Sequence, residues 1–477
     1  MTRRVGEAVG LGGVLLAATL LFSRGFGAGA NYDEGVYLAS ADALDDGASL
    51  GEDVFASQPP GFYALLRLAS ALPGDSVDAT RALFLLTAVV GVAAAWALGR
   101  ALTGPAGGLI AAATLLAAPA YPTESFRIAA DSPSIAIALV GLALLAWSLR
   151  RGSSPLAFAS GLALAAAVSV KLFAVLALVP AIGLIVALRP GRRLIGTFVG
   201  GAAAVTLVLL VSYAGSISAL YDDVVAFHTD ARSFDDASGG NIERVVRWFH
   251  PRTVFTLLAA VGAVVWLARG ARPRLLVPLW LWALASAAFL AWQRPLLDHH
   301  FVLLSAAVAV AAGASLSDVG GSARTRRAAA AVLSLVLVAG YAQEWRRVDL
   351  LADPEPDVRA AADAVAAATG PGETIVSDLP IVAHLAERSL PGELVDTSFV
   401  RFESGSLDAP CVLAATDAAG ARVAVVGRMF RSEPALLAGL EARFPERRTF
   451  GEITVLERSP AAAQAARRSA RGPCSTD

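Results

Sequence analysis

The sequence predicts an α-helical polytopic membrane protein with about eleven transmembrane helices and a small C-terminal α/β domain outside the membrane. The first observation is composition: the 477 residues are 56% hydrophobic and 17% charged, with a mean hydropathy of +0.60, whereas a soluble chain carries about a quarter charged residues. The second is that the apolar residues form separate stretches within residues 1–343. The third is that the composition beyond residue 343 resembles that of a soluble domain.

The apolar stretches are expected to be membrane helices, because a span needs about 20 mostly apolar residues, with roughly 17 as a practical minimum. They lie near residues 7–23, 80–100, 105–120, 132–149, 155–170, 172–188, 194–213, 253–268, 275–292, 299–316 and 327–343. The first stretch has a second interpretation as a signal peptide, because Arg3 and Arg4 precede it and Ala28-Gly29-Ala30 resembles a cleavage site.

The short loops set the expected orientation through the positive-inside rule. With a cytoplasmic N-terminus, the inner loops hold arginines such as Arg150 and the outer loops hold acids such as Asp33. An odd number of spans then puts the C-terminal domain on the outer face. Two long outer loops, 24–79 and 214–252, mix acids with aromatic residues. This composition is suited to short helices along the membrane interface.

The expected organisation is a transmembrane domain at 1–343, an extracytoplasmic α/β domain at 344–460 and a disordered tail at 461–477. The α/β domain is predicted to alternate helices with strands, which favours a small layered sheet. The expected helices are 355–369, a helix capped by Ser377 or Asp378 and ending near Arg388, 407–419 and 433–443, and the expected strands are 373–377, 422–427 and 450–457.

Composition also excludes some classes of protein. The two cysteines, Cys411 and Cys474, exclude a disulfide framework and a cysteine-based metal cluster. The net charge of -1 gives no electrostatic support for binding nucleic acid.

Two candidate segments lie in the first outer loop. Asp33 and Glu34 follow the first span, and carboxylates there can accept a proton from a hydroxyl group or hold a cation. The alternative is a pair of solvated loop acids. In the segment from Gln58 to Tyr63, two prolines fix an extended chain before an amphipathic run. The alternative there is a simple helix start.

Two further segments carry charge on the same predicted face. The loop 121–133 contains Glu124, Arg127 and Asp131, and Asp131 alternatively caps the following span. Lys171 is the one lysine among 39 basic residues and stands in an outer turn, where the positive-inside rule explains no cation. Its compact ammonium suits a phosphate ligand, and the alternative is a lysine that reaches toward lipid headgroups.

The fifth segment is the outer turn containing Arg294, Asp298, His299 and His300. Paired histidines with an aspartate are a ligand combination for zinc. Three consecutive residues cannot wrap one ion well, so we assign no metal site here. We favour hydrogen bonding of the histidines to phosphate or substrate, aided by Arg294.

The order of these segments resembles the GT-C superfamily of glycosyltransferases, closest to the family of protein O-mannosyltransferases and lipid A aminoarabinose transferases. The resemblance covers roughly residues 7–343 and rests on five features in order along the chain: Asp33-Glu34, Gln58-Pro59-Pro60, Asp131, Lys171 and the Arg294–His300 turn. Departures are Gly35 after the acid pair, Gln58 where lysine is common, and a C-terminal domain that matches no known acceptor-binding module.

The resemblance implies an enzyme of the cell membrane that moves a sugar from a polyprenyl phosphate to an acceptor hydroxyl of a glycan, lipid or protein, with inversion, on the outer face. It implies catalytic roles for Asp33 and Glu34. The remaining roles are contacts to the donor phosphate by Lys171, Arg127, Arg294, His299 and His300, and to substrate by Glu124, Asp131, Gln58 and Tyr63. A divalent cation is an optional cofactor.

Two other classes compete with this interpretation. A transporter would place charges at mid-membrane and show repeated halves, whereas these spans are nearly free of charge and show no convincing repeat. A non-catalytic envelope assembly protein would bind a partner through its outer α/β domain.

Overall fold

The computed structural model describes residues 2–71, 76–231, 240–249, 253–268, 272–317, 322–351 and 355–469. The chain forms two compact units. Unit 1 consists of Met1–Gly27, Leu72–Ser212 and Asp236–Asp353, and unit 2 consists of Ala28–Ala71, Tyr213–Asp235 and Pro354–Asp477. Each unit is therefore built from three separate stretches of the chain.

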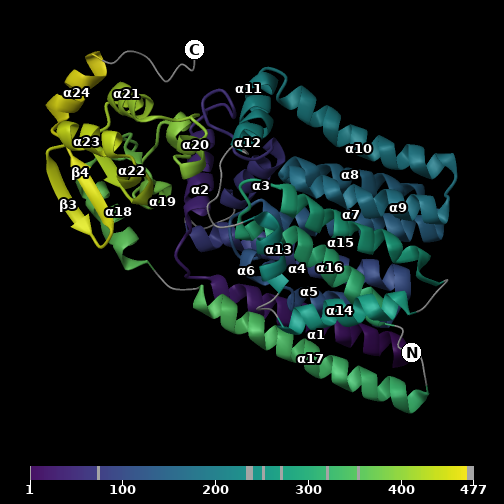
Figure 1. The fold of residues 1–477 in the computed structure, drawn as a ribbon. Coiled ribbons are helices and arrows are strands. Elements are labelled where there is room, and N and C mark those ends of the chain that lie inside the picture. Colours follow the sequence, from purple (N-terminus) through teal and green to yellow (C-terminus); the bar gives the residue numbers. More distant parts are fainter. Residues whose placement is uncertain are drawn as a thin grey trace. The chain divides into compact units, whose positions relative to one another are not determined.

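Unit 1 is a bundle whose long apolar helices run side by side (Figure 1). Helices that are apolar all round are expected where protein and lipid surround them. Its helices are α1 (Thr2–Phe22), η1 (Ser23–Gly25), α4 (Val77–Thr103), α5 (Pro105–Leu116), α6 (Tyr121–Glu124), α7 (Asp131–Arg151), α8 (Ser154–Val170), η2 (Leu172–Ala177), α9 (Leu178–Leu188), α10 (Arg192–Ser212), α13 (Asn241–Phe249), α14 (Thr253–Leu267), η5 (Arg272–Leu275), α15 (Val277–Trp292), η6 (Asp298–His300), α16 (Phe301–Leu316) and α17 (Ala323–Leu350).

Small residues let neighbouring helices of the bundle approach closely. A Cβ atom added at Gly161 in α8 would lie 2.0 Å from the carbonyl oxygen of Phe198 in α10. The reverse contact is equally tight, because a Cβ atom at Gly201 in α10 would lie 2.1 Å from the carbonyl oxygen of Phe158 in α8. This reciprocal contact is the small-residue packing typical of membrane helices.

Six helices within the described residues are long and apolar enough to cross a membrane. They are Arg4–Gly25, Val77–Thr103, Asp131–Arg151, Arg192–Ser212, Asp298–Leu316 and Ala323–Leu350, and a bent pair, Asn241–Phe249 with Val254–Leu267, adds a seventh if it is one span. A helix lies at each stretch where the sequence predicts one, so the chain is a multi-pass membrane protein. Several of these helices have only 10–17 residues, and the count of about eleven spans is not confirmed.

Unit 2 combines helices from both outer loops with the C-terminal domain. The loops contribute α2 (Tyr32–Asp45), α3 (Pro60–Ser70), α11 (Ile217–Tyr221), the π-helix η3 (Asp222–Ala226) and α12 (Phe227–Asp230). These are the short helices expected in the two loops. The C-terminal helices are α18 (Pro356–Ala368), α19 (Pro380–Leu385), η7 (Gly392–Leu394), α20 (Phe399–Glu403), α21 (Ala409–Ala419), α22 (Arg428–Ser432), α23 (Pro434–Arg443) and α24 (Pro460–Ser469).

The C-terminal domain contains one four-stranded sheet with the order β1-β2-β4-β3. The strands are β1 (Val376–Ser377), β2 (Val423–Val426), β3 (Glu446–Phe450) and β4 (Ile453–Glu457). β1 pairs in parallel with β2, with Val376 opposite Ala424, while β4 pairs antiparallel with both β2 and β3. The alternating pattern predicted this layered sheet, but β3 was not among the expected strands because its burial pattern is almost entirely exposed.

Two expectations for the C-terminal domain need correction. Neither Ser377 nor Asp378 caps α19, whose N-cap is Leu379; the Asp378 carboxylate instead accepts hydrogen bonds from the amides of Gly427 and Phe430, which follow β2. Residues 461–469, expected to be disordered, belong to α24, which packs on α21. Alanine has the highest helix propensity, and buried Ala463 fixes one face of this helix. Residues 470–477 lie outside the described residues.

Candidate functional site

A buried ion pair forms the centre of the candidate site in unit 1. Asp131 is the first residue of α7, and Lys171 stands between α8 and η2. Each residue is only 6% exposed, and Lys171 Nζ lies 2.7 Å from Asp131 Oδ2. The two residues are 40 positions apart in the sequence, so tertiary packing brings them together.

Lys171 occupies an irregular position in the backbone. It is the C-cap of α8 and has extended dihedral angles, φ −152° and ψ 129°. Its Nζ lies 5.2 Å from the centroid of the Phe173 ring, a cation–π arrangement. Lys171 is therefore a buried, partnered cation, and the alternative of a lysine that reaches toward lipid headgroups is wrong for its side chain.

Two histidines complete this cluster. His299 and His300 belong to η6, immediately before α16, and their rings meet at a centroid distance of 4.5 Å. The Nδ1 atom of His300 accepts a hydrogen bond from the Leu297 amide at 3.3 Å, and its ring contacts Phe173 at 4.9 Å. In the neutral imidazole this leaves the Nε2–H group of His300 as the donor.

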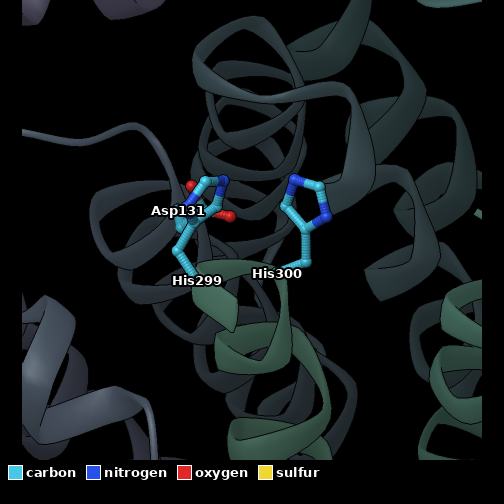
Figure 2. Close-up of side chains that lie close together, drawn as sticks. All are labelled: Asp131, His299 and His300. Carbon is cyan, nitrogen blue, oxygen red and sulfur yellow. The ribbon is translucent and has the colours of Figure 1, made fainter. Parts of the chain in front are cut away.

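The histidines and Asp131 together form a set of potential cation ligands. One ligand atom from each of Asp131, His299 and His300 lies within 4.8 Å of the other two. Figure 2 shows the three side chains close together, with His299 and His300 at the start of α16. The sequence placed Asp298 with the histidines, but the Asp298 side chain is 98% exposed and lies 3.8 Å from Arg244. Asp131 supplies the carboxylate instead, from a different helix.

This cluster combines hydrogen-bond donors with potential metal ligands, and the Lys171 ammonium offsets the charge of the Asp131 carboxylate. Carboxylate and imidazole ligands fit zinc and other transition metals. However, the Lys171 ammonium already donates a hydrogen bond to one Asp131 oxygen. A metal ion bound to Asp131 would lie close to this ammonium, and two buried positive charges so near each other repel strongly. A phosphate would instead meet an ammonium and two imidazoles that can donate hydrogen bonds. The donor set therefore accommodates a metal only in competition with Lys171.

The other predicted residues of unit 1 lie in more exposed positions. Glu124 ends α6 and is half-buried, and Arg127 is half-buried with its Cζ 5.3 Å from the Phe126 ring. Arg294 is exposed, and its carbonyl oxygen accepts a hydrogen bond from Gln293 Nε2 at 3.3 Å. Of the predicted phosphate contacts, the structure groups Lys171, His299 and His300 around Asp131.

Sequence reasoning missed one buried cation on α4. Arg81 is 0% exposed, and its Nη1 lies 3.2 Å from Asp78 Oδ1. The second oxygen of Asp78 accepts a hydrogen bond from the Gly27 amide at 2.9 Å, so the pair also fixes the end of the first helix segment. The available signal was an acid–arginine pair at i, i+3 within the first turns of an apolar helix.

In unit 2, the predicted acid pair begins α2. Asn31 is the N-cap, and it forms a capping box with Glu34: Glu34 N donates to Asn31 Oδ1 at 2.9 Å, and Asn31 N donates to Glu34 Oε2 at 3.1 Å. Glu34 is fully buried, whereas Asp33 is half-buried. The two neighbouring carboxylates therefore differ, because Glu34 closes the helix start and Asp33 is the more accessible one.

The proline segment begins α3, as the helix-start interpretation predicted. Pro59 is the N-cap and Pro60 the first helical residue, and Gln58 Nε2 donates to the Tyr37 hydroxyl at 3.2 Å. Tyr63 contributes to the wall of a cavity of about 660 Å³, which an Asp45–Arg67 ion pair also lines. Tyr63 is 1% exposed, and burial raises the pKa of its hydroxyl. Gln58 and Tyr63 thus belong to unit 2 with Asp33, and their convergence on Lys171 stays a prediction.

Fold and site together define a class: a polytopic helical membrane protein with buried polar clusters and an α/β domain at its C-terminal end. Residues 57–214 match the family described as dolichyl-phosphate-mannose-protein mannosyltransferase. No curated protein sequence matches the chain.

Solved structures that share the fold include those of ArnT and AglB. The chain is similar to ArnT from Cupriavidus metallidurans in the apo state, with a TM-score of 0.68 and 15% identity over 96% of this chain and 99% of that chain. ArnT bound to undecaprenyl phosphate gives a TM-score of 0.66, with 17% identity over 94% and 98% of the two chains. The oligosaccharyltransferase AglB from Archaeoglobus fulgidus, with an inhibitory peptide and a dolichol-phosphate, gives 0.55 and 11% identity over 94% and 74%.

At these identities the likeness to solved structures establishes the fold, and the family segment points to the same class. The resemblance to GT-C membrane glycosyltransferases predicted from the sequence is therefore confirmed.

Proposed function

We propose that this protein is a membrane glycosyltransferase that moves a sugar from a polyprenyl phosphate to an acceptor hydroxyl on the outer face of the cell membrane, with inversion. The acceptor is a glycan, lipid or protein of the cell envelope. The observation that carries the proposal is the Lys171–Asp131 pair beside His299 and His300. The positive-inside rule does not explain a buried cation in an outer turn, so we assign the cation to function. The bound undecaprenyl phosphate of ArnT and dolichol-phosphate of AglB supply the class of donor.

In the proposed reaction, Asp33 is the general base. Its carboxylate takes the proton of the acceptor hydroxyl as the hydroxyl oxygen attacks the anomeric carbon of the sugar. The bond from that carbon to the phosphate oxygen breaks, and polyprenyl phosphate leaves with the bonding electrons. A single displacement of this kind inverts the anomeric centre. Glu34 holds the helix start that carries Asp33, through its capping box with Asn31.

The leaving phosphate gains negative charge, and the cluster in unit 1 suits that charge. Lys171 supplies an ammonium, while His299 and His300 supply imidazole donors. Arg127 and Arg294 are further cations proposed to meet the donor phosphate, and Glu124, Asp131, Gln58 and Tyr63 are proposed to contact sugar or acceptor. If a divalent cation binds, Asp131, His299 and His300 would hold it, and its charge would help to neutralise the phosphate.

The proposal is tested in a strain that lacks the protein, by mass spectrometry of its lipid-linked sugars. We expect the polyprenyl-phosphate donor to accumulate and the glycosylated product to disappear, which identifies both. The wild-type gene restores the product. Asp33→Asn is expected to lower transfer by about 10²- to 10⁴-fold, the usual contribution of a general base. Asp46→Asn, which changes the exposed C-cap acid of the same helix, is the matched control and retains transfer.

Two outcomes would overturn parts of this proposal. Full transfer by Asp33→Asn membranes removes the base assignment, and an unchanged pool of polyprenyl-phosphate sugars removes the donor class. Membranes washed with a chelator are expected to keep their activity if Lys171 and the histidines bind phosphate directly. Loss of activity that added zinc or manganese restores would assign Asp131, His299 and His300 to a cation instead.

A further inference from the structure

Three segments that are distant in sequence meet at Arg401, inside unit 2. Arg401 lies in α20 of the C-terminal domain and is only 7% exposed. Its Nη1 donates to the carbonyl oxygens of Glu393 at 2.6 Å and Asp396 at 2.7 Å. Its Cζ lies 4.1 Å from the ring centroid of Phe55, in the first outer loop. The guanidinium therefore ties the C-terminal domain to the chain that leads into Gln58.

The second outer loop joins the same region through Asp223. Asp223 Oδ2 accepts a hydrogen bond from the Ala56 amide at 2.8 Å, and the amide of Phe55 donates to the Gly392 carbonyl oxygen at 3.2 Å. Asp223 and Asp396 both interact electrostatically with Arg401. Phe55 and Ala56 are thus held from two sides, a few residues before the prolines that begin α3.

The C-terminal domain also holds the first turn of α2. The hydroxyl of Tyr32, the residue before Asp33, donates to Asp396 Oδ1 at 3.0 Å. Asp396 is 7% exposed, and the same oxygen accepts the Ser398 amide at 2.9 Å. The Asp396 carboxylate of the C-terminal domain is therefore hydrogen-bonded to Tyr32, the residue that precedes the proposed base.

Two more contacts continue along α2. A Cβ atom added at Gly35 would lie 2.6 Å from the backbone nitrogen of Ile381 in α19, so the two helices touch through their backbones. Near the other end of α2, His384 Nδ1 lies 2.7 Å from Asp42 Oδ2. α2 is therefore fixed at its start, its first turn and its last turns by one domain.

We infer that Asp396 and Arg401 are positioning residues of the transferase: through Tyr32 and Phe55 they hold the Asp33 helix and the Gln58 segment in the geometry that the reaction needs. The inference rests on the proposed role of Asp33. Its physical basis is that a base must stand within hydrogen-bond reach of the proton it removes, and a displacement of about 1 Å can cost on the order of 100-fold in rate. The C-terminal domain then acts as a brace for the site.

The test compares Tyr32→Phe and Asp396→Asn in the full-length protein. Each is expected to lower kcat about tenfold, near the lower end of what losing a hydrogen bond to a charged group costs, while KM for the polyprenyl-phosphate donor changes less than about twofold. The melting temperature should stay close to wild type, because Phe keeps the ring packing and Asn keeps an acceptor. Asp417→Asn is the matched control: it weakens the ion pairs to Arg443 and Arg458 within the same domain and should leave kcat unchanged.

A cycle with Asp33→Asn separates positioning from a general structural effect. If Asp396 acts through Asp33, adding Asp396→Asn to Asp33→Asn lowers the residual rate no further. Wild-type kcat in Tyr32→Phe and Asp396→Asn, or losses that add to that of Asp33→Asn, would overturn the inference. A fully active Asp33→Asn single variant would instead overturn the proposed base, so the two failures are distinguishable.

Discussion

Buried Asp131 in unit 1 has a different kind of partner from two buried carboxylates of unit 2, those of Glu34 and Asp378. In unit 1, Asp131 faces the ammonium of Lys171, a cation from a distant part of the chain. In unit 2, Glu34 and Asp378 are satisfied by backbone amides, from Asn31 in one case and from Gly427 and Phe430 in the other. A backbone amide that holds a carboxylate is fixed by the local structure. A side-chain ammonium carries a full charge and can also bind an anionic ligand. Glu34 and Asp378 therefore build the fold, whereas Asp131 is the acid that we propose belongs to a site.

The largest expected effect comes from breaking the pair in unit 1. Lys171→Met leaves Asp131 as a buried charge without its partner, which destabilises a protein by about 3–5 kcal/mol. The double variant Lys171→Met with Asp131→Asn removes both charges and should recover most of that stability. Thermal unfolding in detergent measures both effects.

The double variant also separates stability from donor binding. We expect its KM for the polyprenyl-phosphate donor to stay raised although the protein is stable again, because no ammonium remains for the phosphate. A double variant with wild-type KM would contradict the phosphate role of Lys171.

The second effect concerns Asp378, an acid held by amides. Burial raises the pKa of this carboxyl to about 6 from an ordinary value near 4. The folded state therefore retains the proton over a range in which the unfolded state has lost it. As a result, the contribution of this group to stability falls as the pH rises from about 4 to about 6, by about 3 kcal/mol in total. Hydrogen exchange of the Gly427 and Phe430 amides, corrected for intrinsic rates, should show this trend, and in Asp378→Asn it should be flat.

The smallest effect is expected at Glu34 and sharpens its contrast with Asp33. Glutamine serves as well as glutamate in a capping box, so Glu34→Gln should keep both stability and transfer. Glu34→Ala loses the cap and should cost about 1 kcal/mol, measured by chemical unfolding. A large loss of transfer in a stable Glu34→Gln protein would give Glu34 a role in the reaction itself.

Much of the fold was predictable because it depends on local patterns. Apolar length predicted a helix at each expected stretch of unit 1. In the C-terminal domain, alternation predicted strands β1, β2 and β4 and helices α18, α19, α21 and α23, but not the short helices α20 and α22. β3 was missed because its residues are exposed and polar, so no hydrophobic period marks it. The helical start of the tail was missed because alanine and arginine are typical of disordered segments and of helices alike.

The residues of the candidate site could be singled out from the sequence, but which of them lie together in space could not. The sequence singles out Asp131, Lys171 and the histidines in three separate predicted loops. Tertiary packing then places Asp131, and not Asp298, beside Lys171 and the histidines. The capping role of Glu34 was available in the sequence, because Asn31 precedes it by three positions.

The glycine contact between α8 and α10 has a consequence for how this bundle tolerates change. Gly161 and Gly201 each face a carbonyl oxygen of the opposite helix, so the contact surface there is main chain on both sides. At this contact the size of the side chain matters, and its hydrophobicity does not. A single methyl group at either glycine forces the two helix axes apart. A substitution such as glycine to alanine changes hydropathy little, and most positions of these helices would tolerate it. At Gly161 and Gly201 it would not be tolerated, although neither position carries a charged or polar side chain.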